Sequence, residues 1–253
     1  MVRRDSLMYY LYLFSSKVVI SNAGFRKFIP KRKEQIWLET WHGGGAYKKL
    51  NNDDKSDKYK EKLRLLVNSD IDIHLSSCRK FMLDFGEECY IPPKVFLTSG
   101  LPRNDLFFYD FNLITEKVKK KYGVGKNTLI VMYAPTWRDD GRQIQADIFN
   151  SKLVNVIKNK FKKEVIFLYR GHYFKNDCLI KNIIDVSEYD DMQELLCAAD
   201  ILITDYSSCM WDFSLMFKPC FVYANDINKY KQERDFYTPI AEWPFPIAQD
   251  SEF

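Results

Sequence analysis

Residues 129–138 read LIVMYAPTWR, an unbroken apolar run that ends in a loop containing Pro135. A short apolar run bounded in this way is typical of a parallel strand that is buried on both faces. Similar runs recur along the chain, with helical patterns between many of them. They occupy residues 18–21, 36–40, 71–75, 95–98, 165–169, 201–204 and 220–223. This alternation predicts an α/β fold with parallel sheets.

The intervening segments carry apolar residues at helical spacing, and two of them follow plausible helix caps, Asp190 in one case and Ser207 with Ser208 in the other. We expect helices at residues 59–68, 78–85, 147–161, 192–199 and 209–217. Near residues 103–121 a Gly-x-Pro loop gives way to a lysine-rich helix. A length of 253 residues allows two small domains. We therefore predict one domain over residues 1–104 and a second over residues 105–253.

Composition excludes several classes of protein. Hydrophobic residues make up 46% of the chain and charged residues 28%, which excludes a disordered chain and a disulfide-rich miniprotein. None of the six cysteines forms a C-x-x-C pair or lies at zinc-binding spacing from a histidine. We expect reduced thiols, an intracellular protein and no structural metal.

The charge is unevenly distributed. Residues 1–68 carry a net charge of +8, residues 69–184 carry +6 and residues 185–253 carry −10. A basic portion attracts phosphate groups, although a solvated lysine-rich surface would look the same. This charge is the only feature that would suggest a nucleic-acid partner, so we expect none. The apolar run at residues 7–14 is too short to span a bilayer. It could be a core or an interfacial element, and we expect a core element.

The segment Trp41-His42-Gly43-Gly44-Gly45 directly follows the expected strand at residues 36–40. Ligands of open α/β sheets bind beyond the carboxyl ends of the strands, and glycines there let the backbone approach a substrate. A histidine in this place can act as a general base. The alternative is a tight turn with a histidine whose hydrogen bonds are satisfied.

Two further loops after strands carry cationic side chains. Arg138 follows the strand at residues 129–133 and could bind a phosphate through two hydrogen bonds, or pair with a neighbouring aspartate. Arg170, Gly171 and His172 end the strand at residues 165–169. The third histidine, His74, lies inside an expected strand, which favours a structural role.

The segment Thr204-Asp205-Tyr206-Ser207-Ser208 lies between a strand and a helix. Free amides and hydroxyls at the start of a helix can bind a diphosphate, and they can equally serve as helix caps. The chain has no P-loop, no G-x-G-x-x-G fingerprint and no G-x-S-x-G elbow. These absences argue against a P-loop NTPase, a dinucleotide oxidoreductase and an α/β-hydrolase.

Taken in order, these motifs resemble the CDP-glycerol:poly(glycerophosphate) glycerophosphotransferase family, the teichoic-acid polymerase type. The resemblance runs from about residue 21 to residue 246. It is carried by WHGGG at 41–45, SGLPRND at 99–105, YAPTWRDD at 133–140, RGH at 170–172 and the TDYSS region at 185–219.

The resemblance implies a GT-B fold, in which two Rossmann-like domains face each other across a cleft. The N-terminal domain, on the acceptor side, would be incomplete here, and the C-terminal domain would bind the CDP donor. The activity implied is transfer of glycerol phosphate from CDP-glycerol to a hydroxyl of a glycerophosphate polymer or lipid-linked acceptor, with release of CMP. Such an enzyme needs no cofactor or metal and works in the cytoplasm, peripherally at the inner face of the membrane.

The resemblance also assigns residues. His42 matches the base that deprotonates the acceptor hydroxyl, and His172 matches the histidine that stabilises the leaving CMP. The residues expected to bind substrate are Gly43, Gly44, Arg138, Arg170, Thr204, Asp205, Ser207 and Ser208. Asp205 is expected to orient its turn.

Two alternatives remain open. The donor could be CDP-ribitol or another CDP-alditol, because the motifs would read the cytidine diphosphate and not the alditol. The chain could also be a truncated module that binds nucleotide or polymer without turnover. The sequence leaves the acceptor and the oligomeric state undefined.

Overall fold

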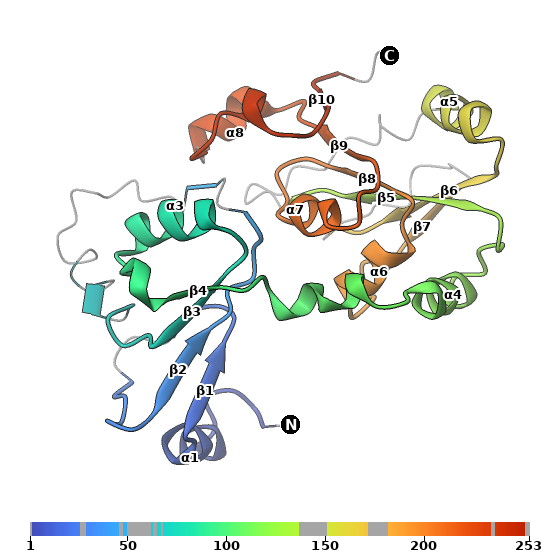
Figure 1. Cartoon of the computed structure of the whole chain (residues 1–253). Helices are drawn as coiled ribbons and strands as arrows, with labels where there is room; N and C mark the ends of the chain where they lie inside the picture. Colours follow the sequence, from blue (N-terminus) through green and yellow to red (C-terminus); the bar gives the residue numbers. More distant parts are fainter. Residues whose placement is uncertain are drawn as a thin grey trace. The chain divides into compact units, whose positions relative to one another are not determined.

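The computed structural model describes residues 2–25, 29–45, 48–49, 62, 65–66, 68–136, 151–171, 182–233 and 236–250. The chain divides into two compact units (Figure 1). Unit 1 comprises residues 1–102 and 231–239, and unit 2 comprises residues 103–230 and 240–253. Residues 231–239, expected in the second domain, thus belong to unit 1, because Phe236 forms a bridge with Lys48 and Tyr237 packs on the unit 1 core.

Unit 1 contains a parallel sheet with the strand order β1-β2-β3-β4. Its described elements are α1 (Leu7–Ser15), β1 (Val18–Ser21), β2 (Ile36–Glu39), β3 (Ile73–Ser76), α3 (Arg79–Cys89), the 3-10 helix η1 (Pro93–Val95) and β4 (Phe96–Thr98). Helix α3 packs closely on β4 at Gly86. A Cβ added at this glycine would lie only 3.0 Å from the Phe96 ring. Phe81, Phe85 and Ile91 are buried in the core beside this helix.

Unit 2 contains a parallel sheet with the strand order β10-β9-β8-β5-β6-β7. Its strands are β5 (Leu129–Ala134), β6 (Val165–Tyr169), β7 (Ile183–Asp185), β8 (Ile201–Thr204), β9 (Cys220–Tyr223) and β10 (Ile247–Ala248). Read from the other edge, the chain order within the unit is 3-2-1-4-5-6, the strand order of the Rossmann fold. All of β5 and β8 is buried, as their apolar sequences predict.

Helices connect these strands. They are the 3-10 helix η2 (Pro102–Phe108), α4 (Asn112–Lys121), α5 (Ser151–Phe161), α6 (Met192–Ala198), α7 (Cys209–Ser214), α8 (Ile227–Glu233) and the 3-10 helix η4 (Ile240–Glu242). The expected helix at residues 209–217 ends at Ser214, and Phe217 adopts a left-handed φ of 54° just before Lys218 and Pro219. Most of the helix expected at residues 59–68 lies outside the described residues, as does the start of the one expected from residue 147.

The apolar run at residues 7–14 was expected to be a core element, and this expectation was wrong. It forms α1, in which Leu13 is the one buried residue, and it is therefore not a core element. Leu7 is 77% exposed and Leu11 53% exposed. The sequence shows that these residues are apolar, but it does not show whether other elements pack on them.

Candidate functional site

In unit 2, the loops after β5 and β8 lie at the point where the strand order reverses. The chain leaves β5 toward β6 on one side, and β8 begins the run toward β9 on the other. Open parallel sheets bind ligands outside the carboxyl ends of the strands at this switch point. The loop after β5 begins with Pro135 and Thr136, and the loop after β8 holds residues 205–208. Two of the predicted motifs therefore meet at one edge of the sheet.

Asp205 joins these two loops. Its Oδ1 accepts a hydrogen bond from the Thr136 amide at 2.8 Å and another from the Tyr206 amide at 2.5 Å. The side chain is 3% exposed, so these backbone groups supply hydrogen bonds that water cannot. The carboxylate therefore fixes the position of both loops.

Thr204 is fully buried at the end of β8. Its hydroxyl donates a hydrogen bond to the Ala134 carbonyl at 2.6 Å, which ties the ends of β5 and β8 together. A hydroxyl that is buried and used in this way holds the sheet. The Thr204 hydroxyl thus has a structural role at the end of the sheet, and its contact with substrate stays a prediction.

Ser207 and Ser208 are half-buried at the start of α7. The Ser207 Oγ accepts a long hydrogen bond of 3.5 Å from the Cys209 amide. Ser208 occupies the N-cap position, but its side chain makes no capping hydrogen bond. The capping interpretation therefore applies to Ser207 and does not account for the Ser208 hydroxyl.

Arg170 and Gly171 follow β6. The Arg170 guanidinium donates a hydrogen bond to the Tyr189 carbonyl at 2.5 Å, and the Gly171 amide donates one to the Ser187 hydroxyl at 3.1 Å. A Cβ added at Gly171 would overlap the Tyr169 hydroxyl, so any other residue there would require the Tyr169 ring to shift. The other cationic candidates of unit 2, Arg138 and His172, lie outside the described residues.

In unit 1, His42 lies just beyond β2 and is exposed. Its Nδ1 lies 2.8 Å from the Asn22 carbonyl oxygen, and its ring packs 4.3 Å from the Trp41 ring. A carbonyl oxygen can only accept, so Nδ1 carries the proton in this hydrogen bond. In the neutral imidazole, Nε2 then has a lone pair and can accept a proton.

The glycines after His42 shape the loop. Gly44 is buried and Gly45 has a φ of 62°, a conformation that favours glycine. The Gly45 amide lies 3.3 Å from the Ser77 hydroxyl, which accepts its hydrogen bond. The triple glycine thus keeps this backbone close to the end of β3.

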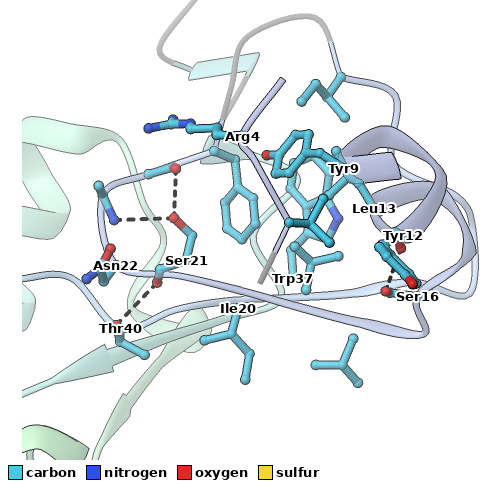
Figure 2. Close-up of a pocket in the computed structure, with 17 residues that line it drawn as sticks. Arg4, Tyr9, Tyr12, Leu13, Ser16, Ile20, Ser21, Asn22, Trp37 and Thr40 are labelled. Atoms are coloured by element: carbon cyan, nitrogen blue, oxygen red, sulfur yellow. Dashed lines mark hydrogen bonds between the residues drawn. The ribbon is translucent and has the colours of Figure 1, made fainter. Parts of the chain in front are cut away.

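A pocket of about 660 Å³ lies in unit 1 between α1 and β1. Figure 2 shows Tyr9, Leu13 and Trp37 along its apolar side, with Ser21 and Thr40 hydrogen-bonded at its polar side. Asn22, which accepts the hydrogen bond of His42, also lines it. The sequence did not predict this pocket, because α1 was expected in the core.

A partly buried ion pair in unit 2 was also missed. The Arg103 guanidinium donates to both Asp212 carboxylate oxygens at 3.1 Å, and the Asn104 side-chain amide donates to one of them at 2.7 Å. Asp212 lies in α7, the helix that follows Ser207 and Ser208. The PRND sequence at 102–105 contains Arg103 and Asn104, but Asp212, which accepts their hydrogen bonds, lies more than 100 residues further along the chain.

Other titratable groups are structural. His74 is buried among the rings of Phe81, Phe85 and Phe96, and this burial lowers its pKa to about 4. Burial raises the pKa of Cys197 and of Cys209 to about 11. Within the described ranges, no group of histidine, cysteine and carboxylate side chains could hold a metal ion.

The strand order of unit 2, the switch-point loops and the second parallel sheet define an α/β protein with a Rossmann-type unit and a polar site at its strand ends. The match to a family model covers residues 1–252. The chain belongs to the CDP-Glycerol:Poly(glycerophosphate) glycerophosphotransferase family, a family of transferases.

Two relatives and one solved structure illustrate this membership. The teichoic acid poly(glycerol phosphate) polymerase of Bacillus spizizenii is 31% identical, over 99% of this chain and 68% of its own length. The polymerase of the same name from Staphylococcus epidermidis is 31% identical over 98% of this chain and 38% of its own. The structure of the wall teichoic acid polymerase TagF matches with a TM-score of 0.84 and 29% identity, over 99% of this chain and 65% of that chain.

A UDP-GlcNAc 2-epimerase from Neisseria meningitidis matches with a TM-score of 0.52 and 16% identity, over 85% of this chain and 62% of that chain, which reflects the fold alone. The chain thus spans between 38% and 68% of the lengths of these proteins. The predicted fold class and family are confirmed.

Proposed function

We propose that this chain transfers glycerol phosphate from CDP-glycerol to a hydroxyl of a glycerophosphate polymer or lipid-linked acceptor, in the synthesis of a teichoic-acid-like or capsular polymer. The observation that carries the proposal is the family match over residues 1–252. It is supported by the described residues 41–45, 135–136, 170–171 and 205–208, which follow strands. The chain spans only part of the length of its relatives, so their activity is a proposal for this chain.

On this proposal, unit 2 is the donor domain. The Ser207 and Ser208 hydroxyls lie at the switch point and donate hydrogen bonds to the diphosphate of CDP. Arg138 and Arg170 neutralise its negative charge, and His172 stabilises the leaving CMP. Phosphoryl transfer depends chiefly on such positioning and charge neutralisation, so these residues need no cofactor.

Unit 1 is the acceptor domain. His42 Nε2 accepts the proton of the acceptor hydroxyl, because Nδ1 already carries the proton donated to Asn22. The acceptor oxygen attacks the phosphorus that carries glycerol, the bond from this phosphorus to the bridging oxygen breaks, and CMP leaves with that oxygen. Gly43 and Gly44 let the acceptor approach the backbone.

The direct test is incubation of the protein with CDP-glycerol and a glycerophosphate primer. The proposal predicts that one CMP is released for each glycerol phosphate added to the primer. If a related polymerase releases CMP under the same conditions and the folded protein releases none, the proposed transfer is excluded for this chain.

A second donor has support of its own. A teichoic acid ribitol-phosphate primase of Bacillus spizizenii is 28% identical over 88% of this chain and 60% of its own length. CDP-ribitol is therefore the alternative donor. A competition assay with both donors decides between them: preferential incorporation of ribitol phosphate would replace the proposed substrate.

A module that binds without turnover is the remaining alternative, because the chain spans only part of its relatives. Isothermal titration with CDP separates it from the enzyme. Binding of CDP by a protein that transfers nothing would favour the module, whereas binding accompanied by CMP release favours the enzyme.

We also propose that α1 places the chain on the inner face of the cell membrane, in the cytoplasm. Over the part of the chain that the structure describes, no helix is long and apolar enough to span a bilayer. Leu7, Met8 and Leu11 are nevertheless exposed on α1, and the exposed cations Arg4 and Lys17 flank the helix. An apolar surface bordered by cations fits an anionic lipid surface.

Sedimentation with vesicles tests this contact. We expect binding to phosphatidylglycerol vesicles and little binding to phosphatidylcholine vesicles, and we expect L7S/L11S to weaken it strongly. Leu113→Ser is the matched control, since Leu113 is 75% exposed on α4. Equal binding by L7S/L11S and wild type would exclude α1 as the contact.

A further inference from the structure

Glu39 is the last residue of β2 and is 1% exposed. One carboxylate oxygen accepts the Trp41 amide at 2.9 Å, and the other accepts the Gly24 amide at 3.0 Å. We call this arrangement the Glu39 bridge. It joins residues 22–24 to the segment that begins at Trp41.

These two segments also hold His42. The imidazole belongs to the residue after Trp41, and its Nδ1 bonds to the Asn22 carbonyl, two residues before Gly24. The Glu39 bridge therefore connects both ends of the hydrogen bond that orients His42. Figure 2 shows the segment around Ser21 and Asn22 beside Thr40.

The backbone at both ends of the bridge has a positive φ, which is uncommon for Trp41 and ordinary for a glycine. Trp41 has a φ of 57°, in the left-handed region that non-glycine residues rarely adopt, and Gly24 has a φ of 79°. The left-handed conformation is unfavourable for a residue with a Cβ, so the contacts around Trp41 must hold it. A carboxylate that accepts the Trp41 amide is such a contact, because hydrogen bonds to an ionised acceptor are strong.

The chemistry of Glu39 agrees with this geometry. Burial raises the pKa of Glu39, while hydrogen bonds from the Trp41 and Gly24 amides and the Ser21 hydroxyl oppose that rise. A buried carboxyl needs several hydrogen-bond donors. The backbone donors here are the ones that set the position of the His42 loop.

We infer that Glu39 is a positioning residue that fixes the orientation and tautomer of His42. The catalytic part of this inference rests on the proposed function, in which His42 is the base. The structural part does not, because the bridge and the tautomer can be observed without turnover.

Glu39→Gln is the main variant. It keeps the shape of the side chain, but its Nε2 cannot accept, so one of the two amides loses its partner. Glu87→Gln, an exposed glutamate on α3, is the matched control. The first readout is ¹⁵N NMR of the imidazoles, which is tractable because the chain has three histidines.

We expect the His42 signals of E39Q to lose the pattern of a single Nδ1-protonated tautomer, while the His74 signals stay unchanged as a check on the fold. Unchanged His42 signals in a folded E39Q protein would overturn the inference. If E39Q fails to fold, hydrogen exchange of the wild-type Gly24 and Trp41 amides decides instead: strong protection supports the bridge, and exchange at the rate of an open loop overturns it.

The second readout is CMP release. We expect E39Q to lower kcat about 10- to 100-fold, with a much smaller change in the KM for CDP-glycerol, as for a misplaced catalytic group. In a His42→Ala background, E39Q should have no further effect, because its role passes through His42. If wild type releases no CMP, the proposed function fails, whereas the NMR result still decides the position of His42.

Discussion

The carboxylate of Asp205 accepts the amide of Thr136 at 2.8 Å and so joins the loops that follow the neighbouring strands β5 and β8. This hydrogen bond lies at the switch point of the unit 2 sheet. Replacing Asp205 by alanine leaves the Thr136 and Tyr206 amides without their acceptor. We expect the free energy of unfolding to fall by about 1–3 kcal/mol and CDP binding to weaken.

Urea denaturation and calorimetric titration with CDP measure the two effects of Asp205→Ala. Asp190→Ala removes an exposed carboxylate from the same unit and serves as the control. Wild-type stability and CDP affinity in Asp205→Ala would show that the carboxylate does not organise these loops.

The Arg103–Asp212 pair should be important for stability. Asp212 is buried and Arg103 is 24% exposed, so removing Asp212 leaves a partly solvated guanidinium and an unpaired Asn104 amide, and we expect Asp212→Ala to cost roughly 1–3 kcal/mol of unfolding free energy. Lys117→Ala breaks the pair with Glu194, in which the lysine is 61% exposed, and should cost less than about 1 kcal/mol. Equal urea midpoints for the two variants would contradict this difference.

The buried histidine predicts a pH dependence of stability. Because burial lowers the pKa of His74 to about 4 from 6.5, the unfolded chain binds a proton in this range that the folded chain does not. The contribution is complete above pH 6.5 and is lost as the pH falls toward 4, by about 3 kcal/mol in the limit.

Urea denaturation at pH 7.5, 6 and 5 measures this effect. His74→Phe keeps an aromatic ring and removes the titrating group, so its stability should fall less between pH 7.5 and 5 than that of wild type. Parallel losses in the two proteins would show that other groups cause the acid sensitivity.

The cysteines should differ in reactivity. Cys78 is exposed, whereas Cys89, Cys197, Cys209 and Cys220 are buried. Burial also raises the pKa of Cys197, Cys209 and Cys220, which lowers the thiolate fraction available for reaction. The sixth cysteine, Cys178, lies outside the described residues, so the test uses a Cys178→Ser background. In that background we expect one fast equivalent with a thiol reagent, which the further change Cys78→Ser abolishes. A fast equivalent that persists would place another thiol at the surface.

Much of the fold could be predicted because buried parallel strands are almost entirely apolar. The runs at residues 165–169, 201–204 and 220–223 correspond to β6, β8 and β9. Strands β7 and β10 were missed, because both are short, lie at the edges of the sheet and are only partly buried. Two or three apolar residues do not stand out as a strand in the sequence.

The site could be predicted only where a motif follows its own strand. His42 lies just beyond β2, and Ser208 lies at the end of the loop that joins β8 to α7, as their positions after apolar runs suggested. The partner of Arg103 could not be predicted, because Asp212 is distant in sequence and the fold alone brings the two together. In the sequence, Glu39 is simply a polar residue at the end of a strand. Its hydrogen bonds with the Gly24 and Trp41 amides could not be predicted, because they depend on the conformation of the loops.

The measurement that tests the central claim most directly is acceptor-dependent release of CMP from CDP-glycerol by wild type and His42→Ala. The account predicts that wild type releases CMP only when the acceptor is present and that His42→Ala is slower by about 10²- to 10⁴-fold, the usual contribution of a general base. His74→Phe, which lies outside the proposed catalytic machinery, should retain the wild-type rate. Equal rates for wild type and His42→Ala would contradict the role of His42 as the base.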